Sequence, residues 1–230
     1  MTTISNRLQD ILATIQSAQA CSPFAQTVKL VAVSKAQPVS AIRETYQAGQ
    51  SIFGENYLQE ALDKQAQLTD LNIEWHFIGP IQSNKTQPIS QNFAWVHSVD
   101  RLKIAQRLNE ARPGDLPPLQ VCIQVNVSNE DTKSGVLPEN LAALAAEIQK
   151  LPRLSLRGLM AIPAPTQDIN LQIEQFKRVR QCYDALIEKG FALDTLSIGM
   201  SDDYQVAIAQ GATFVRIGSA LFGARPGSLK

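Results

Sequence analysis

The sequence predicts an α/β fold, a single barrel of eight parallel strands with an additional helix at its amino-terminal end. Short runs of aliphatic and β-branched residues alternate with longer segments of helical character along the whole chain. Tight hairpin turns are absent between consecutive strand-like runs, so parallel strands with helical crossovers are expected. Eight is the number at which such a sheet closes, and a chain of 230 residues suits one (β/α)8, or TIM, barrel.

The predicted strands are short apolar runs, each ending close to a glycine, a proline or a polar residue. The longest run, residues 119–127, is rich in β-branched residues. In chain order they cover residues 30–35, 51–54, 73–78, 93–96, 119–127, 154–160, 194–198 and 213–217.

The segments between the strands are predicted to be helices, and one further helix precedes the first strand. That first helix is amphipathic, because residues such as Leu8, Ile11 and Ile15 recur at helical spacing. Composition changes nowhere enough to mark a boundary, so residues 1–230 are expected to form one barrel domain. The other helices are predicted at residues 38–48, 57–68, from 83 with an interruption at Pro88, from an N-cap at Asp100 to 112, and at 138–150, 169–189 and 202–210.

Charge and cysteine usage exclude several classes of protein. The chain has 21 basic and 21 acidic residues, so it lacks the basic surface typical of proteins that bind nucleic acid or anionic membranes. Residues 1–20 lack the continuous apolar stretch of a signal peptide or membrane span, which predicts a cytoplasmic protein. Three widely spaced cysteines fit neither a disulfide framework nor a zinc site, and we expect no metal.

Residues at the carboxyl ends of barrel strands are the candidates for chemistry, because the loops there build the site. The first strand ends at Lys35. Such a lysine is either a surface residue with its amino group in water or a nucleophile that forms a Schiff base with a carbonyl compound. Both histidines, His76 and His97, also fall near strand ends. We interpret His97 as a hydrogen-bonded structural residue and not as a metal ligand.

Small residues follow the last two strands. Residues 199–201 (GMS) precede a predicted helix, and Gly218 and Ser219 precede a short apolar segment. Backbone N–H groups of such residues, together with a serine hydroxyl, can hold a phosphate, although ordinary turns favour the same residues. A lysine opposite a phosphate site at a barrel mouth indicates a phosphorylated aldehyde held as a Schiff base, which describes pyridoxal 5′-phosphate.

Several longer motifs resemble those of the pyridoxal phosphate homeostasis proteins, which are single-domain relatives of the N-terminal barrel of alanine racemase. The motifs span nearly the whole chain, and the stretch from His76 to Lys85 is the most specific. They are residues 32–35 (AVSK), 53–57 (FGENY), 75–85 (WHFIGPIQSNK), 156–160 (LRGLM), 197–201 (SIGMS) and 216–219 (RIGS).

The resemblance implies a role for each matching residue. Lys35 is expected to form the Schiff base, and Arg216 to meet the pyridine nitrogen. Phosphate binding is expected from Met200, Ser201, Gly218 and Ser219, and the rest of the pocket from Val33, Asn56, His76 and Met160.

Arg216 has a chemical consequence of its own. Arginine keeps its proton under ordinary conditions and can only donate hydrogen bonds, so it favours an unprotonated pyridine nitrogen. An unprotonated ring is a weaker electron sink, which restricts the carbanion chemistry of the cofactor. Without the surrounding motif, a strand-end arginine paired with a surface carboxylate would be the alternative interpretation.

Two functions fit these features: a binder active in intracellular vitamin B6 homeostasis, and an amino-acid racemase. Racemisation needs a base on each face of the substrate carbon, and in alanine racemase a second domain supplies a tyrosine for this. This chain ends soon after the last predicted strand, and its tyrosines, of which Tyr57 is nearest a strand end, offer no obvious replacement. We therefore expect a non-catalytic monomer, with a regulatory protein or cofactor-receiving apo-enzymes as partners.

Overall fold

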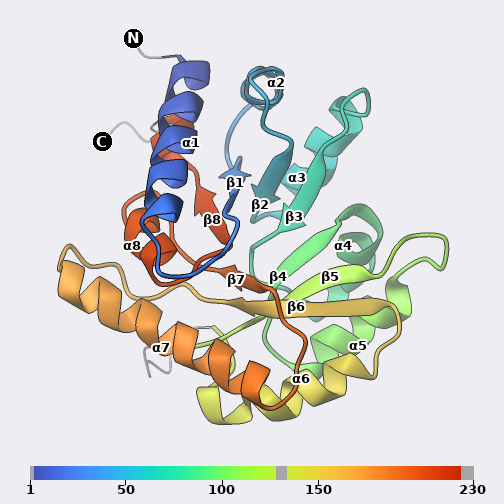
Figure 1. Ribbon diagram of the computed structural model, residues 1–230. Coiled ribbons are helices and arrows are strands. Elements are labelled where there is room, and N and C mark those ends of the chain that lie inside the picture. Colours follow the sequence, from blue (N-terminus) through green and yellow to red (C-terminus); the bar gives the residue numbers. More distant parts are fainter. Residues whose placement is uncertain (1–2, 128–133, 224–230) are drawn as a thin grey trace.

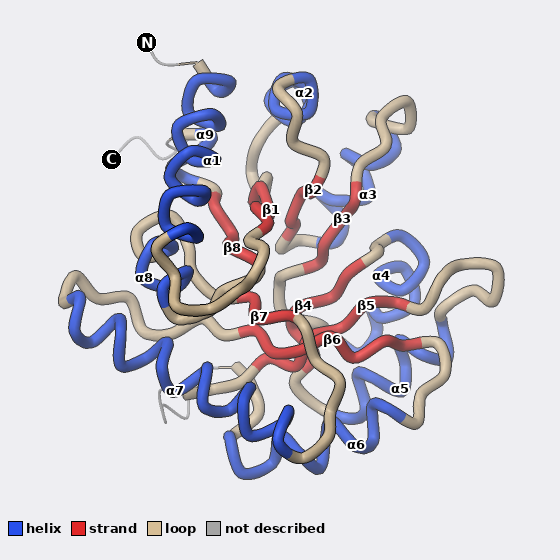
Figure 2. The backbone as a smooth tube through the Cα atoms, in the orientation of Figure 1, coloured by secondary structure: helices blue, strands red, loops and turns tan. Residues whose placement is uncertain are grey.

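The computed structural model describes residues 3–127 and 134–223 and contains the closed barrel that the sequence predicts (Figure 1). The strands pair in chain order, each parallel to the next, and the last strand pairs with the first. The tube view in Figure 2 shows the strands at the centre with helices around them. The strands are β1 (Lys29–Val33), β2 (Ile52–Glu55), β3 (Glu74–Phe77), β4 (Trp95–Val99), β5 (Leu119–Gln124), β6 (Leu154–Met160), β7 (Thr195–Ser197) and β8 (Phe214–Ile217).

The helices cover the outside of the barrel, and most lie within a few residues of the predicted ranges. Short 3₁₀ turns at Ser83–Lys85 and Pro138–Asn140 lead into two of them. In chain order they are α1 (Ile4–Ala20), α2 (Val39–Gln47), α3 (Leu58–Gln67), α4 (Thr86–Asn92), α5 (Leu102–Ala111), α6 (Leu141–Gln149), α7 (Ile169–Glu188), α8 (Tyr204–Ala209) and α9 (Ser219–Phe222).

The apolar strands are explained by burial on both faces. Alternate strand residues such as Leu30 and Ala32 belong to the large core between strands and helices. Their neighbour Val31 belongs to a smaller cluster in the interior of the barrel. That inner cluster consists of Val31, Trp95, Cys122, Met160 and Phe214. Cys122 is therefore a core residue, as its sequence surroundings suggest.

The amino-terminal helix α1 takes the place that a long eighth crossover helix would occupy. In the described part of the chain, β8 is followed by the short α9, and α1 packs against α2, α8 and α9 (Figure 2). Arg7 of α1 donates a hydrogen bond of 2.5 Å from Nε to the carbonyl oxygen of Leu221. A cation at this end of α9 suits the partial negative charge of a helix carboxyl terminus. The extra helix thus completes the outer layer and holds α9 in place.

Two predicted helix boundaries are wrong. Pro88 does not interrupt a helix, because it lies in the first turn of α4, where its missing N–H would have no partner within the helix. Asp100 is not an N-cap: the cap of α5 is Arg101, without a side-chain cap hydrogen bond. The Asp100 carboxylate instead accepts a hydrogen bond of 2.7 Å from the Arg101 guanidinium.

Strand β5 is also shorter than predicted. It ends at Gln124, and an isolated parallel bridge between Val125 and Val136 follows it. Apolar residues continue to Val127 because this segment stays buried after it leaves the sheet. Burial, and not strand pairing, explains the long apolar run.

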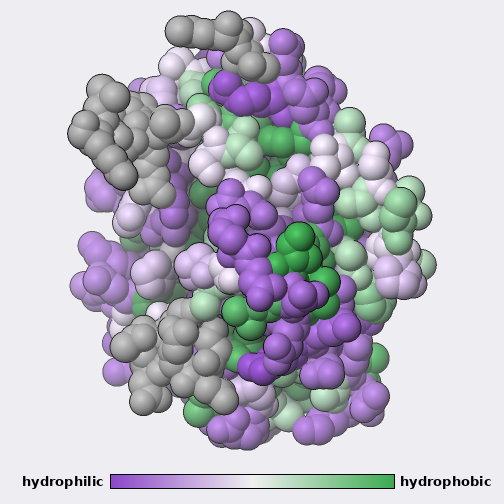
Figure 3. Space-filling view, turned by 90° about the vertical axis from the view of Figure 1, so that its left-hand side faces the viewer, coloured by the Kyte–Doolittle hydropathy of each residue, from purple (hydrophilic) through white to green (hydrophobic). Residues whose placement is uncertain are grey.

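The surface of the molecule is mostly hydrophilic on the face shown in Figure 3, with a compact hydrophobic group near its centre. In the described ranges, the helices lack the combination of length and apolar character that a membrane span requires.

We predict that Gly79→Ala destabilises the barrel by about 3 kcal/mol, the upper part of the range for overpacking. Gly79 follows β3, and a Cβ atom there would overlap the backbone carbonyl of Asn56, which follows β2. The backbone would have to move to relieve this overlap. Urea unfolding of the purified variant measures the loss.

Gly114→Ala is the matched control, because a Cβ at Gly114 meets nothing within 4 Å. We expect this control to unfold at nearly the wild-type urea concentration. Equal stability of both variants would contradict the predicted overlap between a Cβ at position 79 and the Asn56 carbonyl.

Candidate functional site

A pocket of about 280 Å³ opens at the carboxyl ends of the strands. It lies where loops of β1, β7 and β8 meet, and β1 and β8 are neighbours in the closed sheet. The residues predicted for a cofactor site that line it are Val33, Lys35, Asn56, Met200, Ser201, Arg216, Gly218 and Ser219. Lining residues that the sequence analysis missed are Gln37, Ile78, Ile162, Asp202 and Gly223. Gln37 lies two residues after Lys35, and Asp202 directly follows Ser201. Their position in the same loops as predicted residues is the signal that could have identified them.

Lys35 lies two residues beyond β1, in a tight turn, and is partly buried. The next residue, Ala36, has a left-handed backbone with φ of 59°, a conformation that costs a non-glycine residue about 1–2 kcal/mol. Its N–H donates a hydrogen bond of 2.6 Å to the carboxylate of Glu60 on α3. The turn that presents Lys35 is therefore held by a side chain from a neighbouring helix.

A buried ion network lies behind this turn. Lys64 of α3 donates hydrogen bonds of 2.7 Å to the carbonyl oxygen of Ser34 and 2.7 Å to Oε1 of Glu55. It also contacts the Glu60 carboxylate at 2.5 Å, and the Ser34 hydroxyl donates to Glu55 Oε1 at 2.6 Å. Glu55 is fully buried, which raises the pKa of its carboxyl group, and Lys64 opposes this rise. The network fixes the backbone on both sides of Lys35.

The loops after β7 and β8 are joined to each other. Gly199 has φ of 91°, and a Cβ there would lie 2.6 Å from the Cβ of Ala207, so the chain needs a glycine to pass α8 closely. Further along the first loop, the Ser201 hydroxyl accepts a hydrogen bond of 3.3 Å from the backbone N–H of Ala220 in α9. The small residues thus bring two backbone segments and two serine hydroxyls, those of Ser201 and Ser219, to one side of the pocket.

Arg216 reaches the pocket from inside the barrel and is only 4% exposed. Its guanidinium donates hydrogen bonds of 2.6 Å and 2.8 Å to the carbonyl and hydroxyl oxygens of Ser197, and one of 2.9 Å to the carbonyl oxygen of Ala161. These bonds use three of the five N–H groups of a guanidinium. Burial lowers the pKa of Arg216 to about 10, so the side chain remains charged at neutral pH.

Asn56 adds an unsatisfied acceptor. Its Oδ1 atom is buried and has no hydrogen-bond partner in the described part of the chain. A buried polar atom without a partner is uncommon and indicates a place where a ligand or water binds. Because Asn56 lines the pocket, this oxygen is available to a donor there.

His76 and Met160, both predicted for the pocket, do not line it. Each is fully buried in the interior of the barrel, and Met160 belongs to the inner apolar cluster. His97 is likewise fully buried and is hydrogen-bonded, although inside the barrel and not at its mouth. Burial lowers the pKa of both histidines, so both are neutral at pH 7.

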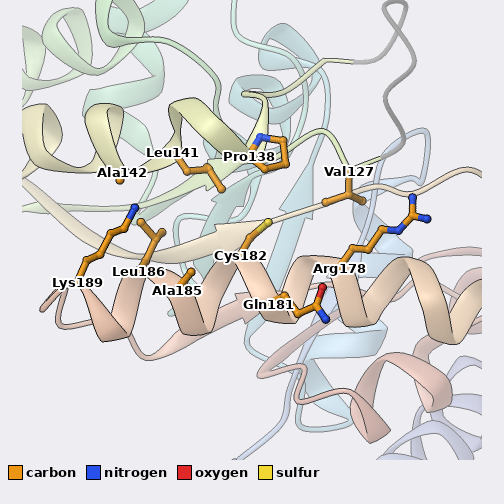
Figure 4. A pocket seen from close by; sticks show the side chains of 10 residues that line it. All are labelled: Val127, Pro138, Leu141, Ala142, Arg178, Gln181, Cys182, Ala185, Leu186 and Lys189. Carbon is orange, nitrogen blue, oxygen red and sulfur yellow. The ribbon is translucent and has the colours of Figure 1, made fainter.

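Three other pockets are larger than the one beside Lys35. The first, of about 370 Å³, lies at the amino ends of β3 and β4, and the guanidinium of its Arg112 already donates to backbone carbonyl oxygens. The second, of about 520 Å³, lies between α6 and α7 and is largely aliphatic (Figure 4). Its cationic side chains lie apart, Arg178 within α7 and Lys189 at the residue that caps the carboxyl end of this helix.

The third, of about 600 Å³, lies at the amino ends of β1 and β7. Its arginines are already paired, Arg157 with Asp194 and Arg180 with Asp184. Among residues 3–127 and 134–223, no group of three or more potential metal ligands gathers. The pocket beside Lys35 is therefore the candidate site.

Comparison with known proteins shows which family has this sequence and this barrel. The family model of the alanine racemase N-terminal domain matches residues 7–226. A pyridoxal phosphate homeostasis protein of Pseudomonas aeruginosa is 59% identical over 226 residues, covering 98% of this chain and 97% of its own. The protein of the same name from Escherichia coli K12 is 48% identical over 234 residues, with both chains fully covered.

Solved structures agree with these matches. PipY from Synechococcus elongatus, determined without and with bound pyridoxal phosphate, superposes with TM-scores of 0.86 and 0.85. It is 37% identical, and the match covers 96% of this chain and all of PipY. Alanine racemase from Corynebacterium glutamicum has a TM-score of 0.69 at 18% identity, covering 96% of this chain and 64% of the racemase, which shows a shared fold.

We predict that Lys64→Met destabilises the protein by about 3–5 kcal/mol at neutral pH, because it leaves the buried Glu55 carboxylate without its cation. The loss should shrink as pH falls. The pKa of folded Glu55 is already raised above its unfolded value, and removing Lys64 raises it further. The folded variant therefore binds a proton more tightly than the unfolded chain, and it gains stability as pH falls toward the unfolded pKa.

Urea unfolding at about pH 7.5 and about pH 5.5 measures this effect. The control is the double variant Lys64→Met with Glu55→Gln, which removes the uncompensated charge and should recover part of the loss. A loss of the same size at both pH values would show that Glu55 is not its source.

Proposed function

The chain belongs to the pyridoxal phosphate homeostasis protein family, whose barrel is that of the alanine racemase N-terminal domain, and we propose that it binds pyridoxal 5′-phosphate as a Schiff base on Lys35. The observation that supports this proposal most strongly is the set of residues that line one pocket. It joins a lysine held in a constrained turn, two loops suited to an anion and a buried arginine. Those are the groups that the aldehyde, phosphate and ring nitrogen of the cofactor require.

The residues of the pocket fit the cofactor group by group. Ser201, Gly218 and Ser219 supply hydroxyl and backbone N–H donors for a phosphate, and Met200 lies beside them. Arg216 has N–H groups left over for the pyridine nitrogen, and the orphaned oxygen of Asn56 can accept a hydrogen bond. The cofactor supplies an aldehyde for Lys35 and an electron sink for amino-acid chemistry.

Arg216 also restricts what the bound cofactor can do. The guanidinium stays charged at neutral pH, since even the lowered pKa of about 10 lies well above 7. A charged donor beside the pyridine nitrogen opposes protonation of the ring, which weakens the electron sink. This chemistry suits a protein that holds the cofactor better than one that uses it in broad catalysis.

We further propose that the protein serves vitamin B6 homeostasis, and through it amino-acid and keto-acid balance, without efficient catalysis. Racemisation requires a base on each face of the substrate carbon. Within the described residues, the pocket lining includes Lys35 and the carboxylate of Asp202, but no tyrosine such as alanine racemase uses, and no histidine or cysteine. Tyr57 is 59% exposed and does not line the pocket. Recipient apo-enzymes, a regulatory partner, a monomeric state and a cytoplasmic location stay predictions.

We predict that borohydride reduction of the loaded protein fixes a pyridoxyl group on Lys35. A hydride added to the Schiff base makes the link permanent, so a peptide map locates it. Lys35→Ala should abolish both the label and the absorbance of the bound cofactor.

Lys29→Met is the matched control, because Lys29 lies at the amino end of the same strand, away from the pocket. It should label as the wild type does. A pyridoxyl group on a peptide without Lys35, or none at all, would overturn the proposed site.

We also predict that the loaded protein does not exchange the α-proton of alanine in deuterium oxide faster than free pyridoxal phosphate does. Mass spectrometry of the recovered amino acid measures deuterium, and chiral chromatography measures the other enantiomer. Exchange at a useful rate that disappears in Lys35→Ala would favour the racemase instead.

A further inference from the structure

A continuous chain of hydrogen-bonded side chains crosses the interior of the barrel and ends at Arg216. It begins at Glu74, the first residue of β3, whose side chain is 44% exposed. It then passes through His76 of β3 and His97 of β4 to Ser197, the last residue of β7. The two histidines, which the proposed cofactor site does not use, are its central members.

The four contacts of this relay are all within hydrogen-bond distance. Oε1 of Glu74 lies 2.9 Å from Nε2 of His76, and Nδ1 of His76 lies 2.9 Å from Nε2 of His97. At the other end, Nδ1 of His97 lies 2.8 Å from the Ser197 hydroxyl, which accepts from Arg216 at 2.8 Å. Each ring nitrogen of both histidines therefore has a partner.

The two ends of the relay determine its direction. A guanidinium can only donate, so the Ser197 oxygen accepts from Arg216 and its own proton is free to point to Nδ1 of His97. An ionised carboxylate can only accept, so Nε2 of His76 carries a proton that points to Glu74. A neutral imidazole has one N–H, so Nδ1 of His76 must accept from Nε2 of His97. Every proton in the relay then points from Arg216 toward Glu74.

Aromatic rings enclose the two histidines. The ring of Trp95 stacks on His76 with centroids 5.4 Å apart, and the Phe214 ring meets it edge-on at 5.3 Å. His97 lies 5.6 Å from the same Phe214 ring. Both histidines are fully buried, so water cannot substitute for a missing partner without entering the barrel.

We propose that Glu74, His76, His97 and Ser197 are positioning residues for Arg216: together they form a one-directional hydrogen-bond relay that holds its guanidinium at the cofactor pocket. This inference deepens the proposed function and rests on it for the identity of the ligand that Arg216 meets. The carbonyl oxygens of Ser197 and Ala161 anchor the same guanidinium, and the relay adds the Ser197 hydroxyl as a third acceptor, itself hydrogen-bonded to His97. The N–H groups that remain are thereby directed to the pocket.

The direction of the relay is testable in the cofactor-free protein by nitrogen-15 NMR of labelled histidine. The chain contains only His76 and His97, so the spectrum reports the relay alone. We expect both rings to be neutral and protonated at Nε2 at pH 7. A ring protonated at Nδ1, or an imidazolium, would overturn the proposal.

Glu74→Lys should reverse the direction of the hydrogen bonds in the relay. A lysine at this end donates, so His76 would have to accept at Nε2 and carry its proton at Nδ1, and His97 would follow. We expect both histidines to change to the Nδ1–H tautomer. Glu74→Gln keeps an acceptor oxygen and should retain the wild-type spectrum, as should Glu110→Lys, the same charge change at an exposed residue of α5. If Glu74→Lys leaves the tautomers unchanged, the relay does not transmit direction.

Protein loaded with pyridoxal phosphate tests whether the relay positions Arg216 at the pocket. Ser197→Ala removes the hydroxyl between Arg216 and His97, and we expect release of pyridoxal phosphate to become about tenfold faster, the effect of losing one hydrogen bond to a charged group. Absorbance follows the release, and borohydride labelling of Lys35 in the variant shows that the Schiff base still forms. Release at the wild-type rate would overturn the positioning role.

The NMR experiment and the release experiment together distinguish failure of this inference from failure of the proposed function. If wild-type protein takes up no pyridoxal phosphate, the proposed function fails and the NMR arm still decides the direction of the relay. If Lys35 is labelled but Ser197→Ala releases the cofactor normally, the proposed function stands and the relay does not position Arg216.

Discussion

The pairing of β8 with β1 is the constraint on which the site depends. Parallel strands that are far apart in sequence become neighbours here, with Val31 opposite Arg216 and Ala32 opposite Ile217. Because all strands run the same way, their carboxyl ends meet at one rim. Lys35 thus comes to lie beside the loops that carry Ser201 and Ser219. Without closure, the lysine and the anion-binding loops would belong to opposite edges of an open sheet.

Two buried polar networks hold two residues that line the pocket, Lys35 and Arg216. One consists of Lys64, Glu55 and Glu60 and fixes the turn that presents Lys35. The other runs through the barrel interior and ends at Arg216. Buried charges and polar groups are costly unless they are satisfied, and each network satisfies nearly all of its members. Their common effect is to give two flexible, charged side chains a defined place.

Local sequence pattern predicted the strands, the outer helices and most of the pocket-lining residues, because each follows from a short apolar run and the residues that end it. It was wrong at Pro88 and Asp100, where the outcome depends on backbone angles at a helix start and not on residue type. It also assigned His76 and Met160 to the pocket. Alternation along a strand shows that a side chain faces inward, but it does not give its height within the barrel.

By itself, then, the sequence determined the barrel, the covalent candidate Lys35 and the glycine and serine residues of the anion loops, since all of these depend on neighbours along the chain. Only the tertiary structure decided how the buried polar groups pair. His97 and Ser197 are 100 positions apart, and Lys64 meets Ser34 across 30. Such partners are chosen by strand register and helix packing, which bring distant residues to the same level of the barrel.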